Sequence, residues 1–277
     1  MPTAEIRIVV AILFTGLLVF PACNDNDEDE QRAGASKGVA SQQASSAQKP
    51  AEKPNVEEEE EGEEGPTVTP SVAAEKPAPL QAAGKQFAYS FDSDAPGQLP
   101  AKFHTGKTGG GTAEKWSVVA DPTAPSNPNV VAQTSTDPTD YRFPLLISDE
   151  GSFQDLDISV RFKAVSGSVD RAGGVVFRLR DPNNYYIVRA NALENNYRLY
   201  HVVNGRRSQF AGANFKVTSG EWHQLRVEVL ANKIACYYDG AKKIDATDTT
   251  FKDAGKVGLW TKADSVTYFD DLKVTAK

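Results

Sequence analysis

The sequence predicts an all-β domain, built as a two-sheet antiparallel sandwich, behind a long N-terminal region of different composition. Two observations favour the sandwich. From residue 86 onward, short segments with alternating apolar and polar residues are separated by Gly, Asn, Asp and Pro clusters, which is typical of half-buried strands and tight turns. No part of this region keeps a helical period for longer than about three turns. Many short strands joined by turns indicate a sandwich.

The first 22 residues are predicted to be a signal peptide of the lipoprotein type. Arg7 precedes an uncharged, mostly apolar run over residues 8–22, which is shorter than the ~20 residues of a membrane-spanning helix and fits a signal peptide. The run ends with Ala22 before Cys23, which resembles a bacterial lipoprotein cleavage site. We therefore expect lipidation of Cys23 and a membrane-anchored protein of the bacterial cell envelope, periplasmic or surface-facing. An ordinary secretory signal is the alternative.

Residues 23–85 are predicted to be a disordered tether, acidic and rich in Pro and Ala. Residues 1–85 hold 15 Asp/Glu and 7 Lys/Arg, and no aromatic residue occurs between Phe20 and Phe87. Such a segment cannot bury enough apolar surface to offset the entropy of ordering. Residues 86–277 hold the remaining 22 acidic and 23 basic residues. This near-neutral balance argues against nucleic-acid binding, which needs a strongly basic domain.

Residues 86–277 are predicted to form the folded domain. Asn204-Gly205 and Asp239-Gly240 are typical of tight hairpins, and the glycine-rich segment 97–111 is predicted to be a long loop. Cys236, within a strand, is predicted to be a small buried apolar side chain that forms no disulfide. The predicted strands are 87–92, 116–120, 129–134, 144–148, 156–165, 175–180, 185–191, 197–203, 222–230, 233–238, 242–246, 256–262 and 266–275.

Arginines on the three central strands predict a polar binding face. Arg178, Arg189 and Arg198 lie mid-strand, and on one sheet they would form a row of guanidinium groups. Guanidinium groups match the hydroxyls and carboxylates of a sugar, an acidic one above all. The alternatives are that these arginines pair with carboxylates of adjacent strands or are solvated. Arginines beside turns are expected to be solvated, namely Arg180, Arg206 and Arg207.

Aromatic residues near these arginines would supply the apolar contact that a pyranose ring needs. Tyr186 and Tyr200 lie on the central strands, and Trp260 lies on the strand 256–262. Because both faces of the strand 185–191 carry bulky groups, the sequence leaves open which of them is the core face. Trp260 could equally pack in the core.

Four stretches resemble the concanavalin A-like jelly-roll superfamily, and more narrowly the laminin-G-like and 3-keto-disaccharide hydrolase domains of secreted bacterial proteins. They are GGVVFRLRDPNNYYIVRANALENNYRLYHVVNGRR, GEWHQLRVEV, CYYDGAKKIDATDTTF and AGKVGLWTKADSVTYFDDLKV. The resemblance covers the chain from about residue 87 to its C-terminus. It implies a jelly-roll sandwich, and it allows either carbohydrate binding or cleavage of a glycoside.

The same resemblance suggests calcium, which jelly rolls often bind where the first and last strands meet. Asp92 and Asp270 follow phenylalanines in two similar segments, and carboxylate oxygens suit calcium. These aspartates could instead cap turns. No other cofactor is expected, because no His/Cys/Asp group has the spacing of a transition-metal site.

Catalytic residues cannot be assigned from the sequence. Asp155 and Asp157 share a strand face, as a glycosidase pair could, but they lie near the start of their strand. Three functions stay open: a carbohydrate-binding lipoprotein of the envelope, a glycoside hydrolase of the 3-keto-disaccharide type, and a structural envelope module. The lack of a clear acid/base pair favours binding.

Overall fold

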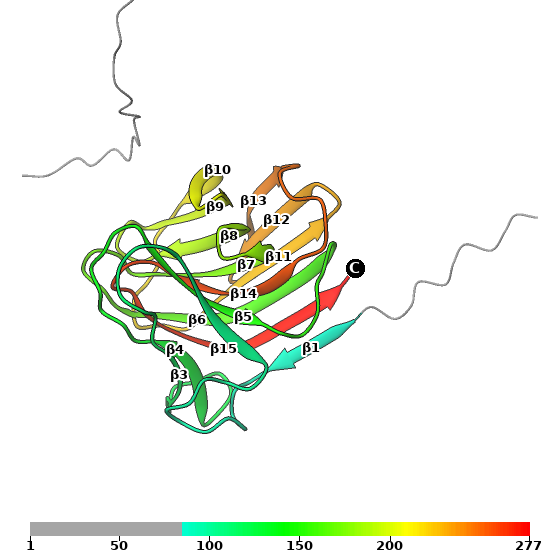
Figure 1. The fold of residues 1–277 in the computed structure, drawn as a ribbon. Helices are drawn as coiled ribbons and strands as arrows, with labels where there is room; N and C mark the ends of the chain where they lie inside the picture. Colours follow the sequence, from blue (N-terminus) through cyan, green and yellow to red (C-terminus); the bar gives the residue numbers. More distant parts are fainter. Residues whose placement is uncertain (1–84) are drawn as a thin grey trace, which may run out of the picture. The chain divides into compact units, whose positions relative to one another are not determined.

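The computed structural model describes residues 85–277, which contain fifteen strands and no helix (Figure 1). Accordingly, no helix in this part of the chain could cross a membrane. The predicted signal peptide, Cys23 and the tether up to residue 84 lie outside the described residues.

The strands follow one another through short turns and a few longer loops. In chain order they are β1 (Gln86–Tyr89), β2 (Phe103–Gly109), β3 (Trp116–Ala120), β4 (Asn129–Gln133), β5 (Arg142–Ser148), β6 (Leu156–Ser166), β7 (Ala172–Asp181), β8 (Asn184–Asn191), β9 (Asn196–Val203), β10 (Arg206–Asn214), β11 (His223–Leu230), β12 (Lys233–Tyr238), β13 (Ala241–Thr247), β14 (Lys256–Thr261) and β15 (Val266–Ala276).

The strands form two stacked antiparallel sheets, so the predicted sandwich is confirmed (Figure 1). Sheet A has the order β13-β12-β11-β6-β15-β4-β3, and β1 pairs with the second half of β15. Sheet B has the order β10-β9-β8-β7-β14-β5-β2. The pairing of β1 with β15 joins the two ends of the domain to each other.

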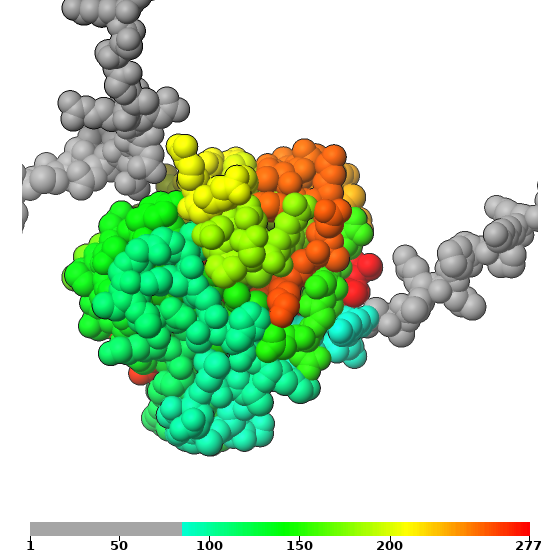
Figure 2. Space-filling view, viewed as in Figure 1, coloured from blue at the N-terminus to red at the C-terminus, as the bar shows by residue number. Residues whose placement is uncertain are grey.

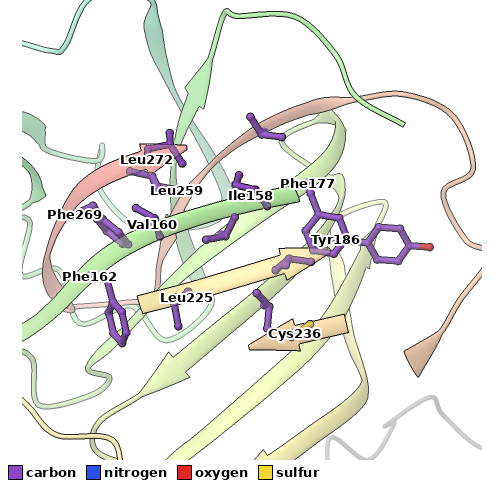
Figure 3. Close-up of a cluster of buried hydrophobic side chains, with 14 of the residues drawn as sticks. Ile158, Val160, Phe162, Phe177, Tyr186, Leu225, Cys236, Leu259, Phe269 and Leu272 are labelled. Carbon is purple, nitrogen blue, oxygen red and sulfur yellow. The ribbon is translucent and has the colours of Figure 1, made fainter. Parts of the chain in front are cut away.

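The main core lies between the two sheets (Figure 3). Alternation along β6 buries Leu156, Ile158 and Val160 on one face and leaves the residues between them partly exposed, as a strand requires. Cys236 is fully buried in this core, and burial raises the pKa of its thiol. The prediction of a buried, unpaired Cys236 is confirmed.

A second apolar cluster covers the face of sheet B that points away from sheet A, here called the outer face. Its members all belong to strands of sheet B or flank them, and they are Phe143, Leu145, Ile147, Ala172, Val176, Leu179, Tyr185, Ile187, Tyr200, Val202 and Trp260. These side chains are buried although no strand of sheet A covers them. Sheet B must therefore bury them by curling on itself.

Contacts between distant strands show this curl directly. The hydroxyl of Thr108 in β2 is hydrogen-bonded to that of Tyr185 in β8 at 2.8 Å. Tyr141, just before β5, donates its hydroxyl to the carbonyl of Gly205 in the β9–β10 turn. In the space-filling view, the teal segment around β2 adjoins the yellow-green segments of β8 and β9 (Figure 2). The curl thus encloses the outer face of sheet B.

Every predicted strand overlaps a real one, and two strands were not predicted. The segment 97–111, expected to be a loop, contains β2, and β10 follows the hairpin turn at Asn204-Gly205. Both are edge strands with few buried apolar residues, so neither shows the alternation of a half-buried strand. The hairpin at Asp239-Gly240 joins β12 to β13, and both turn residues have positive φ, as such turns require.

The prediction that Arg178 belongs to an exposed row of arginines is wrong. A bulge between Phe177 and Asp181 gives Arg178 a φ of 46°, and its side chain is 1% exposed. The guanidinium group donates to the carbonyls of Gln154, Phe251 and Ala231 at 2.7, 2.7 and 2.6 Å. Arg178 therefore ties three loops together and has a structural role.

Replacing Arg178 should strongly destabilise the domain. In Arg178→Met, three backbone carbonyls lose their charged donor, and we expect the free energy of unfolding to fall by about 3 kcal/mol or more. The matched control is Arg180→Met, because Arg180 is a neighbouring, exposed arginine whose one ion pair among the described residues is with Asp253. In this control the free energy of unfolding should fall by less than ~1 kcal/mol. Urea denaturation of both variants measures the difference. Equal losses would contradict a structural role for Arg178.

Candidate functional site

Charged and amide side chains gather at one end of the outer face of sheet B. This is the end where β7 and β9 begin and where β8 and β14 finish. Contacts between the side chains join them into one group, which we call the mouth of sheet B. Its members are Asp170, Arg189, Asn191, Glu194, Asn196 and Lys262.

Arg189 is the central cation of the mouth and is 2% exposed. Its Nη2 donates to Glu194 Oε2 at 2.8 Å and to the Tyr200 hydroxyl at 3.0 Å, and its Nη1 donates to Asn196. The guanidinium carbon also lies 5.6 Å from the centre of the Tyr200 ring. Its Nε is buried and has no hydrogen-bond partner among residues 85–277. One donor of this group is thus left for a further acceptor.

The two carboxyl groups of the mouth have opposite pKa shifts. Asp170 is fully buried, and this burial raises its pKa even though Lys262 Nζ lies 3.2 Å from its Oδ2. For Glu194, burial alone would raise the pKa, but Arg189 and the Asn196 amide outweigh it and lower the pKa below its usual value. Asn191 connects the two, because its Nδ2 donates to Asp170 and its Oδ1 accepts the Glu194 N–H.

Arg207 reaches over the aromatic part of the outer face, contrary to the expectation that it is solvated. Its guanidinium carbon lies 4.5 Å from the ring centre of Tyr200, 4.8 Å from that of Phe143 and 5.9 Å from that of Trp260. Its Nη1 is buried without a hydrogen-bond partner in the described part of the chain. The sequence places Arg207 two residues past the Asn204-Gly205 turn, but it does not show that the curled sheet brings aromatic rings beneath it.

The structure brings together some of the residues that the sequence nominated and separates others. Arg189 contacts Tyr200, and Arg207 lies over the rings of both Tyr200 and Trp260. Arg198 pairs with Arg189 across the strands, but its guanidinium turns toward β10, donating to Ala213 O at 2.9 Å and Asn214 Oδ1 at 2.6 Å.

Tyr186 faces away from these residues, so its nomination as a ligand contact is wrong. Its side chain belongs to the core between the sheets and donates to Asp248. Burial, together with this hydrogen bond, raises its pKa to about 12. The core face of β8 is thus the one with Tyr186, which the sequence left open.

The two aspartates nominated for calcium are engaged by protein donors. Asp270 is buried and accepts from the N–H and hydroxyl of Ser126, and Asp92 accepts from the Asn129 N–H. Within residues 85–277, no three His, Cys, Asp or Glu side chains are grouped so that they could hold a metal ion. The geometry fits the alternative in which these aspartates order turns.

Asp155 and Asp157 are also held in separate contacts. Asp155 accepts from the Ala231 N–H and from Arg178, whereas Asp157 forms an ion pair with Arg226 at 2.7 Å. Asp170 and Glu194, the two carboxylates of the mouth, were not nominated. They flank turns rather than lying within strands, so alternation along a strand could not have found them.

Comparison with known proteins identifies the family. Residues 105–275 match the 3-keto-alpha-glucoside-1,2-lyase-like domain, and the chain belongs to this family. No curated protein matches the chain.

Solved structures confirm the jelly-roll fold. A carbohydrate binding module, CBM66 from Bacillus subtilis, is similar at a TM-score of 0.51 and 18% identity, covering 63% of this chain and 96% of that one. Lectin II from Ulex europaeus is similar at a TM-score of 0.50 and 10% identity, covering 70% of this chain and 99% of that one. At these identities the likeness shows the fold.

Removing the Glu194 carboxylate should make the free energy of unfolding depend less on pH in the acidic range. Because its pKa is lowered in the fold, Glu194 contributes stability above its ordinary pKa of 4.5, and this contribution is lost as the pH falls through the lowered value. We expect the free energy of unfolding of Glu194→Gln to be about 1–2 kcal/mol lower than that of the wild-type protein at pH 7. This difference between the two proteins should shrink below pH ~4.5.

Urea denaturation between pH 3 and pH 7 measures this gap. Glu221→Gln is the control, because Glu221 is exposed and makes no ion pair within residues 85–277. A gap for Glu194→Gln that stays constant across this range would contradict the pairing with Arg189.

Proposed function

We propose that the mouth of sheet B, with the half-buried Arg207 beside it, binds a carbohydrate. The observation that carries this proposal is the pair of unused guanidinium donors. Arg189 Nε and Arg207 Nη1 are both buried, both lack a partner among the described residues, and both groups stack on the Tyr200 ring. A buried donor without an acceptor is costly, so a site that leaves two of them unused favours a ligand rich in acceptors.

The rim of the mouth supplies the apolar contact that a sugar also needs. Few large apolar side chains are exposed in residues 85–277. Three of them are next in sequence to an acidic residue near the mouth, namely Tyr141, Val169 and Leu193, which are 44%, 42% and 41% exposed. Tyr141 lies just before β5, and its ring centre is 4.8 Å from that of Phe143. Hydroxyls toward the guanidinium groups and C–H faces toward this rim would suit a pyranose.

The family and the similar folds support this ligand class. The family is named for a lyase that acts on a 3-keto-α-glucoside, and both similar structures have names that point to carbohydrate. The proposal therefore takes a glycoside as the ligand.

Cleavage of the glycoside is the second candidate, and the paired carboxyl groups favour it. Asp170 has a raised pKa and Glu194 a lowered one, and opposite shifts in one site are typical of an acid and a base. In a 1,2-elimination, a base takes the C2 proton, which the adjacent C3 ketone acidifies. The C2–H electrons form the C1=C2 bond, the C1–O bond breaks, and an acid protonates the departing oxygen. In this scheme Glu194 serves as the base, and Asp170, whose pKa is raised by burial, serves as the acid.

Binding and cleavage are separated by one set of titrations on the full-length chain. An α-glucosyl disaccharide and its 3-keto derivative are titrated by calorimetry, and formation of the conjugated enone is followed by ultraviolet absorbance. We expect both sugars to bind, and Arg207→Met to weaken binding at least tenfold, which is ~1.4 kcal/mol. The matched control, Arg206→Met, removes an exposed neighbouring arginine and should bind normally.

Enone formation from the keto sugar, abolished in Asp170→Asn while binding persists, would establish the lyase. Binding without any product would establish the binding function alone. If neither sugar binds or reacts, or if Arg206→Met and Arg207→Met weaken binding equally, the proposal fails.

We also propose that the domain is tethered to the bacterial envelope by a lipid on Cys23. The support is the apolar run that ends with Ala22 before Cys23. In cells that process lipoproteins, Cys23→Ser should move the protein from the detergent phase to the aqueous phase on phase partitioning. An unchanged partition would rule out lipidation at this residue.

A further inference from the structure

Next to the mouth lies a wide, open depression of about 780 Å³ that no part of the proposed function uses. It is formed where the β8–β9 turn meets the end of β10. The lining residues are Glu194, Asn195, Arg198, Asn214, Phe215 and Lys216. Glu194 belongs to both the mouth and this depression, so the two adjoin each other.

The depression carries an excess of positive charge. Arg198 and Lys216 line it, and Lys243 Nζ lies 4.9 Å from the ring centre of Phe215. Within residues 85–277, none of these three cations has a carboxylate within 4 Å, whereas most other basic groups of sheet B do. The one acidic lining residue, Glu194, is already paired with Arg189 at 2.8 Å. Uncompensated cations around a concave surface raise the local concentration of anions.

The walls of the depression are held in place by hydrogen bonds. The Phe215 N–H donates to Asn195 O at 3.1 Å, and the Val217 N–H donates to Asn195 Oδ1 at 3.2 Å. Arg198 is fixed by Ala213 and Asn214, which accept from its two Nη atoms. These acceptors are neutral, so they orient the guanidinium group without neutralising it. A preorganised cation costs less entropy when it binds an anion.

We propose that this depression is a subsite for an anionic sugar residue, carrying a carboxylate or a sulfate ester, within a glycan whose neighbouring unit occupies the mouth. The position of the neighbouring unit rests on the proposed function; the anion subsite itself does not. Arg198 and Lys216 contact the anionic group, and Lys243 adds to the positive potential. The domain therefore prefers acidic glycans over neutral ones.

The test is an NMR titration of the full-length, ¹⁵N-labelled chain with galacturonate, galactose 6-sulfate and galactose. We expect the two anionic sugars to shift the amide signals of Asn195 and Lys216, and added salt to weaken this binding, because exposed charges are screened. Galactose should leave these two signals unchanged. Whether galacturonate or the sulfate ester binds more tightly identifies the anionic group.

Two double variants with the same change of net charge separate a subsite from general attraction. Arg198→Gln with Lys216→Gln should weaken binding of the anionic sugars at least tenfold, whereas Arg206→Gln with Lys233→Gln, which alters exposed cations elsewhere, should not. Equal weakening in both variants, or no shift of Asn195 and Lys216 with either anion, would overturn the subsite. An α-glucosyl disaccharide, titrated in the same way, tests the mouth itself. If the anions shift the signals of Asn195 and Lys216 but this disaccharide does not shift those of Asp170 and Asn191, the subsite stands and sugar binding in the mouth fails.

Discussion

The curl of sheet B is the constraint on which the rest of the structure depends. Hydrogen bonds between the Thr108 and Tyr185 hydroxyls, and from the Tyr141 hydroxyl to the Gly205 carbonyl, join strands that lie far apart in the sheet order. Without them the outer face would expose a continuous aromatic and aliphatic surface, which a monomeric domain rarely tolerates. With them, that surface becomes a second core, and burying each large side chain contributes roughly 1.5–3 kcal/mol.

The same curl determines which arginine side chains lie on the enclosed face of sheet B. Arg189 and Arg207 lie on the enclosed face and stack on Tyr200. Away from water, a hydrogen bond from either guanidinium group is stronger than it would be in solvent. Arg178 sits at a bulge, where the strand twists away from the face and the side chain binds three loop carbonyls instead. The arginines of sheet B thus have different surroundings. Arg189 and Arg207 each keep a donor without a partner among residues 85–277, whereas Arg178 ties loops together.

Sequence alternation predicted most of the fold because it reports burial on one face of a strand. It found the strand with Leu156, Ile158 and Val160, and it missed β2 and β10, whose edge positions need little burial. It could nominate Arg189, Tyr200 and Trp260 but not Arg207, Asp170 or Glu194. Those residues flank turns, and only the curl of the sheet brings them to the site.

The mouth combines unused guanidinium donors, two carboxyl groups with opposite pKa shifts and an exposed apolar rim, in a chain of the 3-keto-alpha-glucoside-1,2-lyase-like family. A crystal structure of the protein soaked with an α-glucoside tests the central claim most directly. The account predicts sugar oxygens within hydrogen-bond distance of Arg189 Nε and Arg207 Nη1. A sugar bound on sheet A, or these two donors facing only water while the sugar lies elsewhere, would contradict it.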